Sequence, residues 1–214
     1  TVTFEVFPEL SGSIRYGFLL WNLFLAWIPY ALSLLIVRMW SRPGPSALRR
    51  PAVVGTGLLW LFFYPNAPYI LTDFVHVIQV PVRIRPERSH PLITENAVLW
   101  YDIILNSAFA FVGHIVGLIS LMILHRAIRE RFGNRIAWGF ATAATILGGY
   151  GIYLGRFVRF NSWDIFRRPA DTVPVALSNL LNPKALLFSL AFGFFIFLTY
   201  LIVWSLCETA HRLE

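Results

Sequence analysis

Long apolar runs separated by short polar connectors dominate this chain. A helix that crosses the hydrocarbon core of a bilayer needs about 20 predominantly apolar residues. Five runs meet this length, at residues 17–37, 52–72, 97–124, 136–157 and 185–206. Their apolar side chains surround the whole helix rather than one stripe, and backbone groups in lipid must bond within their own segment. The pattern predicts an all-α, polytopic transmembrane helix bundle with about five spanning helices, forming a single transmembrane domain over residues 1–214.

Composition supports the same class of protein. Hydrophobic residues make up 57% of the 214 residues and charged residues 14%, against a usual share of about 25% charged. A water-soluble domain of this size could not bury so much apolar surface. One cysteine, Cys207, excludes an internal disulfide and a Cys-based metal site, and the five histidines have no ligand spacing. We therefore expect no metal, and the sequence does not identify a cofactor.

The basic residues suggest how the chain is oriented. Net charge is +7, and the arginines lie in short clusters between apolar runs, which is typical of membrane loops rather than of nucleic-acid surfaces. Two short Arg-rich loops, 38–50 and 126–135, fall on one side of the membrane because two predicted helices separate them. The positive-inside rule makes that side cytoplasmic. The inverted orientation remains open, because the two sides carry equal numbers of basic residues and only the density of charge differs.

The opposite connectors, 73–96 and 158–184, are long and about half apolar. Such stretches are typical of interfacial or re-entrant segments, and they are too short to span. Residues 1–15 are expected to form a loop on the same outer side. Because the sequence starts at Thr1, either its start has been processed away or a further helix precedes it.

Paired prolines interrupt the end of the second apolar run. Pro65 and Pro68 remove two backbone donors, and Asn66 and Asp73 lie beside the freed carbonyls. Broken helices of this kind often line polar cavities. The alternative is a helix that simply ends at Pro65.

A second polar group follows the fourth apolar run. Arg156 and Arg159 are three residues apart and share a helix face, with Asn161 and Asp164 directly after them. Charges near apolar segments are costly and need partners. Arginine recognises phosphate and carboxylate in bidentate fashion, so the group is a candidate anion site. A structural ion pair and side chains that reach the lipid headgroups are the alternatives.

The third apolar run contains Asp102 and Asn106, four residues apart on one helix face. An acid inside a membrane helix is by default a candidate functional residue, although Asp102 also lies where an interfacial charge would. Glycines of the fourth run, Gly148, Gly151 and Gly155, have the spacing that lets helices approach closely, so we expect them to pack against another helix.

Three segments resemble an uncharacterised family of bacterial integral membrane proteins, labelled domain of unknown function 1361. They are Leu20–Pro29, Pro65–Asp73 and Gly151–Phe157, the last followed by Arg159 and residues 161–164. The resemblance covers nearly the whole chain, from about residue 18 to 204. It implies a multi-helix fold in a bacterial inner membrane or a thylakoid-type membrane, and a further helix before residue 1. It implies no activity, substrate or catalytic residue.

Three functions are compatible with these observations. The first is an accessory or structural subunit that packs in a larger membrane complex, with the bilayer and other membrane subunits as partners. The second is a transporter or a lipid- or anion-binding protein with a polar site at the outer membrane face. The third is a membrane enzyme acting on a lipid-linked phosphate, which the absence of a familiar catalytic motif disfavours. The candidates for the polar site are Asn66, Asp73, Asp102, Asn106, Arg156, Arg159, Asn161 and Asp164.

Overall fold

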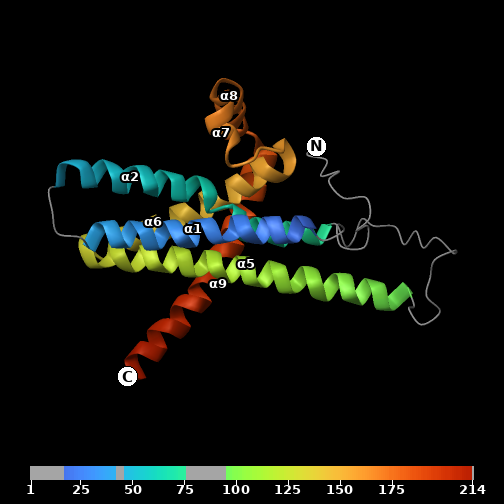
Figure 1. Cartoon of the computed structure of the whole chain (residues 1–214), viewed down its shortest axis with the longest axis horizontal. Helices are drawn as coiled ribbons and strands as arrows, with labels where there is room; N and C mark the ends of the chain where they lie inside the picture. The colour runs from blue at the N-terminus through green and yellow to red at the C-terminus, as the bar shows by residue number, and fades with distance from the viewer. Residues whose placement is uncertain (1–16, 42–45, 76–94, 214) are drawn as a thin grey trace.

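A computed structural model describes residues 17–41, 46–75 and 95–213 of the chain. All the regular structure in these ranges is helical (Figure 1). In chain order the elements are α1 (Gly17–Ser41), α2 (Ser46–Phe63), α3 (Asn66–Tyr69), the 3-10 helix η3 (Ile70–Asp73), α5 (Glu95–Phe132), α6 (Asn134–Tyr153), the π-helical turn η4 (Leu154–Val158), α7 (Asp164–Arg167), α8 (Pro169–Asn179) and α9 (Pro183–Leu213).

Three helices in the described ranges are long and apolar enough to cross a membrane, namely Gly17–Ser41, Trp100–Phe132 and Pro183–Ala210. The all-α membrane fold is therefore supported, while the expected number of about five spans is not reached by this criterion. The first turns of α2 carry Arg49 and Arg50, and α6 begins with Asn134 and Arg135. Neither α2 nor α6 is among these three helices: α2 includes two arginines, and α6 is rich in glycine, threonine and tyrosine, so both are less apolar than the three spans.

Three predicted boundaries were wrong. Most of the expected loop 38–50 is helical, because α1 runs to Ser41 and α2 begins at Ser46. The run 52–72 is not one helix, because α2 ends at Phe63 and the chain continues as the short helices α3 and η3 after Pro65. Proline at position 65 lacks the N–H that would continue the ladder. The expected loop 126–135 is mostly helix, because α5 runs to Phe132 and α6 starts at Asn134. Only Gly133 separates them, and its φ of 87° is one that glycine adopts at little cost.

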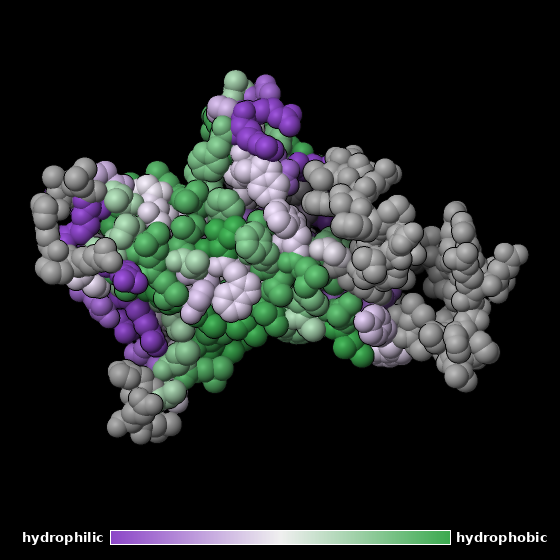
Figure 2. All heavy atoms as spheres, in the orientation of Figure 1, coloured by the Kyte–Doolittle hydropathy of each residue, from purple (hydrophilic) through white to green (hydrophobic). Residues whose placement is uncertain are grey.

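The helices α1, α2 and α5 lie side by side along the long axis of the molecule, and α9 crosses them obliquely (Figure 1). The most extensive contacts join α6 to α9 and α1 to α5. Polar residues gather at the left-hand end of the molecule and at its top, while the face in view between them is largely apolar (Figure 2). This distribution is the one expected where lipid chains contact the middle of a helix bundle.

The Arg-rich segments lie together at one end of the molecule. Arg131, near the end of α5, stacks over the Trp40 ring at 5.4 Å, and the rings of Trp40 and Phe132 are 5.9 Å apart. Arg129 is 3.5 Å from Glu208 of α9. We call this the Arg-rich end, formed by the end of α1, the start of α2, the end of α5 and the start of α6.

Buried polar groups tie the helices together near that end. His125 of α5 is fully buried, and its Nδ1 lies 2.6 Å from the Tyr200 hydroxyl of α9. The His125 ring also stacks on Trp204 at a centroid distance of 4.2 Å. Such contacts explain this histidine as a packing residue that joins α5 to α9.

Glycines let the broken segment 64–73 lie between α5 and α6. On α6, a Cβ atom added at Gly151 would collide with the Pro65 ring, with Pro65 Cβ 2.7 Å away. On α5, a Cβ added at Gly117 would lie 2.7 Å from the Cβ of Ala67. The predicted packing glycines therefore face the segment from one side: Gly148 meets Tyr64, Gly151 meets Pro65, and Gly155 meets Tyr69.

This close approach makes Gly151 sensitive to the smallest substitution. We expect Gly151→Ala to destabilise the folded protein by about 1–3 kcal/mol, since the added methyl group must displace Pro65. Thermal unfolding in mild detergent measures the change. Gly139→Ala on the same helix is the matched control, because a Cβ there meets nothing within 4 Å and alanine favours helix. Equal melting temperatures for the two variants would contradict the packing described here.

Candidate functional site

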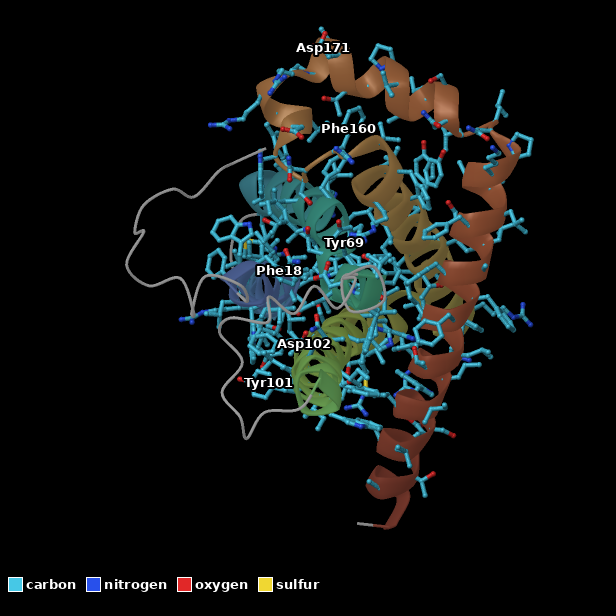
Figure 3. The ribbon with its side chains drawn as sticks, turned by 90° about the vertical axis from the view of Figure 1, so that its right-hand side faces the viewer. Phe18, Tyr69, Tyr101, Asp102, Phe160 and Asp171 are labelled. Carbon is cyan, nitrogen blue, oxygen red and sulfur yellow. The ribbon has the colours of Figure 1, made fainter. Side chains whose placement is uncertain are left out.

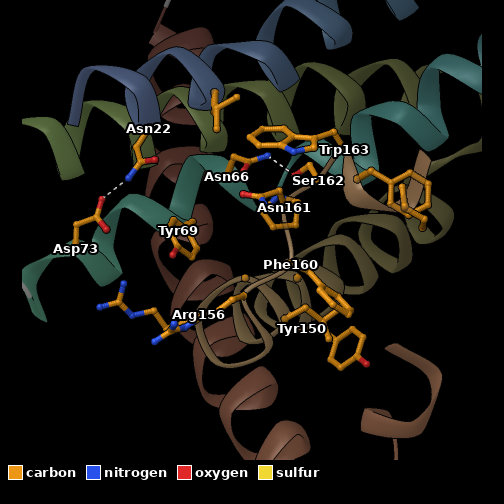
Figure 4. Close-up of a pocket in the computed structure, with 18 of the residues that line it drawn as sticks. Asn22, Asn66, Tyr69, Asp73, Tyr150, Arg156, Phe160, Asn161, Ser162 and Trp163 are labelled. Carbon is orange, nitrogen blue, oxygen red and sulfur yellow. Dashed lines mark hydrogen bonds between the residues drawn. The ribbon is translucent and has the colours of Figure 1, made fainter. Parts of the chain in front are cut away.

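A cavity of about 1150 Å³ lies at the end of the bundle opposite the Arg-rich end (Figure 4). Its walls come from the first turns of α1, the last turns of α2, the early part of α5, the last turns of α6, and the segments α3, η3, η4 and α8. This volume is slightly above the usual range of small-molecule sites, which is about 300–1,000 Å³. Figure 3, which looks onto the ends of α1 and α5, shows Tyr69 between Phe160 above and Asp102 below.

Seven of the eight polar residues singled out from the sequence line this cavity, although they come from separate parts of the chain: Asn66, Asp73, Asp102, Asn106, Arg156, Arg159 and Asn161. The eighth, Asp164, lies outside the lining. Its Oδ2 accepts hydrogen bonds from the backbone N–H of Asn161 at 2.7 Å and from Asn161 Nδ2 at 3.1 Å. Asp164 therefore shapes the turn that carries Asn161.

The carboxylate of Asp73 is fixed from α1. Asp73 is 2% exposed, and its Oδ2 accepts a hydrogen bond from Asn22 Nδ2 at 2.7 Å. Sequence reasoning missed Asn22, even though it interrupts an otherwise apolar run. A polar residue inside a membrane helix usually faces a partner or a cavity, and this signal could have found it.

The Asn66 side chain satisfies a backbone carbonyl that is left unpaired where α2 ends. Its side-chain amide donates to the Phe63 carbonyl at 2.9 Å, which is a carbonyl freed where α2 ends. The same amide donates to Ser162 Oγ at 2.8 Å. Asn66 thus ties the broken helix to the loop after η4, and it positions the two halves of the cavity wall relative to each other.

Two unusual backbone conformations position Arg156 and Arg159 in the cavity wall. Arg156 lies in the π-helical turn η4, and Arg159, directly after it, has a left-handed φ of 63°. Single π turns inside helices and non-glycine residues with positive φ cost free energy and are often found at functional sites. The turn is held by a hydrogen bond from the Phe160 N–H to the Leu154 carbonyl at 3.1 Å.

Both guanidinium groups are available to a ligand. Within the described part of the chain, neither Arg156 nor Arg159 has a side-chain hydrogen bond or a carboxylate within ion-pair distance. Arg156 is half-buried and Arg159 is exposed. In Figure 4, Arg156 and Asp73 lie toward one end of the cavity, and Ser162 and Trp163 lie toward the other. An anion entering the cavity would meet two arginines without displacing a protein partner.

On α5, Asn106 contributes a buried acceptor. The residue is 4% exposed, and its Nδ2 donates to the Asp102 carbonyl at 2.8 Å. Its Oδ1 has no hydrogen-bond partner among the described residues. Leaving a buried acceptor unsatisfied costs about 1–3 kcal/mol. A donor brought by a ligand, after a small shift of the side chain, would satisfy it.

The rest of the lining is aromatic and apolar. The rings of Trp21 and Trp163 meet edge to face, with centroids 6.3 Å apart, across α1 and the loop before α7. On the far side, Tyr150 donates to the Ala176 carbonyl and so anchors α8 against α6. Thr172 and Ala176 of α8 complete the wall.

The described residues contain no group of three or more His, Cys, Asp or Glu side chains that could hold a metal ion. The mid-span histidine His114 instead lies 2.8 Å from Thr199 Oγ1 of α9 and stacks on Phe195. It joins α5 to α9 outside the cavity.

The strained position of Arg159 gives a stability prediction. Glycine adopts a left-handed backbone readily, whereas alanine pays the same steric cost as arginine. We expect Arg159→Gly to be more stable than Arg159→Ala by about 1 kcal/mol, measured by thermal unfolding in detergent. If Arg159→Ala equals or exceeds Arg159→Gly in stability, the left-handed turn is not present in the protein.

Comparison with known proteins identifies a family for the chain but no function. No curated protein and no solved structure matches it. One family model matches residues 21–199, which is most of the chain and includes nearly all the lining of the cavity. The chain belongs to the family described as Protein of unknown function (DUF1361).

Proposed function

We propose that this is an integral membrane protein that binds a ligand with an anionic group, phosphate or carboxylate, in the cavity between α1, α5 and α6. One observation carries the proposal: two arginines with no partner in the described chain line a cavity of about 1150 Å³, and a π turn and a left-handed residue place them there. Guanidinium groups bind both anions in bidentate fashion.

The proposal includes a membrane orientation. The cavity is built from the start of α1, the end of α2, the start of α5 and the end of α6, whereas the Arg-rich end uses the opposite ends of these helices. Chain direction alternates from α1 to α2 and from α5 to α6, as it would if α2 and α6 also crossed the bilayer, giving five spans with α9. The positive-inside rule then makes segments 38–50 and 126–135 cytoplasmic and opens the cavity to the outer face of the membrane, in a bacterial inner or thylakoid-type membrane.

An accessory subunit is less well supported by the geometry. Many large apolar side chains are exposed on the helices, but contact with lipid accounts for them as well as contact with another subunit would. A large cavity with unpaired arginines is not needed for packing. Ligand binding explains both the size of the cavity and the presence of the two arginines in its wall.

An enzyme acting on a lipid-linked phosphate would use the same arginines with Asp73 or Asp164 as the base. Asp73 accepts a hydrogen bond from Asn22, and Asp164 accepts two from Asn161. Both carboxylates are thus engaged in hydrogen bonds within the protein, and these contacts favour positioning roles for the two acids over proton abstraction.

Ligand-induced stabilisation tests the binding of an anion. The full chain in mild detergent is heated with inorganic phosphate, glycerol 3-phosphate, phosphatidylglycerol or a fatty acid. A ligand present at a hundred times its dissociation constant adds about 2.7 kcal/mol of stability, which raises the melting temperature. We expect Arg156→Gln and Arg159→Gln each to weaken the binding of the active ligands by about 10–100-fold, since a hydrogen bond to a charged group contributes about 1.5–3 kcal/mol.

The matched control is Arg167→Gln on α7, because Arg167 is exposed and does not line the cavity. It should bind every ligand as the unchanged protein does. The proposal is wrong if no anion of this panel raises the melting temperature, or if Arg156→Gln and Arg159→Gln respond to the ligands as strongly as Arg167→Gln.

A further inference from the structure

We propose that the anionic ligand is a membrane phospholipid, whose phosphate binds Arg156 and Arg159 and whose acyl chains leave the cavity between α1 and α2 into the bilayer. This inference rests on the proposed function and goes further by naming the class of ligand. Three features support it: the size of the cavity, the exposed apolar side chains at its rim, and the tryptophans and basic residues around it.

The cavity is much larger than an anion requires. Its volume of about 1150 Å³ exceeds the usual upper value of about 1,000 Å³ for sites that enclose a drug-sized molecule. Only part of the wall carries charge, and the larger part is aromatic and aliphatic. A ligand that fills this space has an anionic group and a substantial apolar portion.

An apolar rim, formed by Trp21, Phe62 and Phe166, borders the cavity. Trp21 of α1 and Phe62 of α2 line the cavity, yet they are 48% and 39% exposed. Phe166 of α7 packs edge to face on Phe62 at 6.0 Å and extends the rim outward. In a bilayer, apolar side chains exposed on membrane helices face lipid chains, so an acyl chain can lie on this rim without meeting water.

The residues around the cavity are of the kinds found at the membrane interface. Two tryptophans, Trp21 and Trp163, lie in its wall, and tryptophan is enriched where the hydrocarbon core meets the headgroups. The helix α8 adjoins the cavity and exposes Val173, Val175 and Leu177, with Arg167 and Arg168 directly before it. Apolar faces flanked by basic residues are typical of segments lying in the membrane interface.

Native mass spectrometry of the full chain in mild detergent tests the inference. Phosphatidylglycerol is the lipid probe, glycerol 3-phosphate and inorganic phosphate are the soluble probes, and diacylglycerol is the uncharged probe. We expect one phosphatidylglycerol per chain, bound at least ten times more tightly than either soluble phosphate or diacylglycerol. We expect Phe62→Ala to weaken phosphatidylglycerol about 3–10-fold while leaving glycerol 3-phosphate unchanged, because the substitution removes only contact with the acyl chains.

Phe194→Ala is the matched control, since Phe194 is an exposed phenylalanine of α9 that does not line the cavity. It should leave phosphatidylglycerol binding unchanged. The lipid inference is overturned, with the anion site intact, if glycerol 3-phosphate binds as tightly as phosphatidylglycerol or if Phe62→Ala and Phe194→Ala behave alike. If diacylglycerol binds as tightly as phosphatidylglycerol, or if Arg156→Gln binds all probes normally, the anion site itself fails.

Discussion

The contact between the proline-broken segment 64–73 and the glycines on either side of it organises this end of the molecule. Pro65 lies against Gly151 of α6, and Ala67 lies against Gly117 of α5, at distances that leave no room for a Cβ atom. In lipid, helices gain little from burying apolar surface against each other, so close packing of this kind carries much of the association energy. The segment thereby holds α5 and α6 apart at a defined separation.

The same break creates the polar site. A continuous α2 would leave no unpaired carbonyls for Asn66 to satisfy and would carry Asp73 along one straight helix. Because the helix stops at Phe63, Asn66 bonds both the freed carbonyl and Ser162, and Asp73 reaches Asn22 on α1. The strained Arg159 and the π turn at Arg156 line the same cavity as these contacts. Packing energy elsewhere supports a locally unfavourable backbone that presents two cations.

The two ends of the bundle divide the charged groups by role. At the Arg-rich end, Arg129 pairs with Glu208, and Arg131 stacks on Trp40. At the cavity end, Arg156 and Arg159 have no such partners in the described part of the chain. Cations that contact carboxylates and aromatic rings have a structural explanation, whereas the two arginines beside the cavity have none of this kind, and this difference is the basis of the proposed ligand site.

The sequence by itself determined that the chain is an all-helical membrane protein. The length and hydropathy of an apolar run are local properties, and the thickness of the bilayer sets the length that a spanning helix needs. It also pointed to the polar residues, since charges in or beside apolar runs are costly wherever they lie. It could not show that α2 breaks at Pro65 rather than at residue 72, or that α5 continues through Arg126 to Phe132, because a proline or a charge marks a boundary only within a few residues. Only the tertiary structure decided that seven of the eight candidates surround one cavity, that Asn22 belongs with them and that Asp164 does not. Those relations depend on how helices far apart in the chain pack across their glycines, which no local pattern encodes.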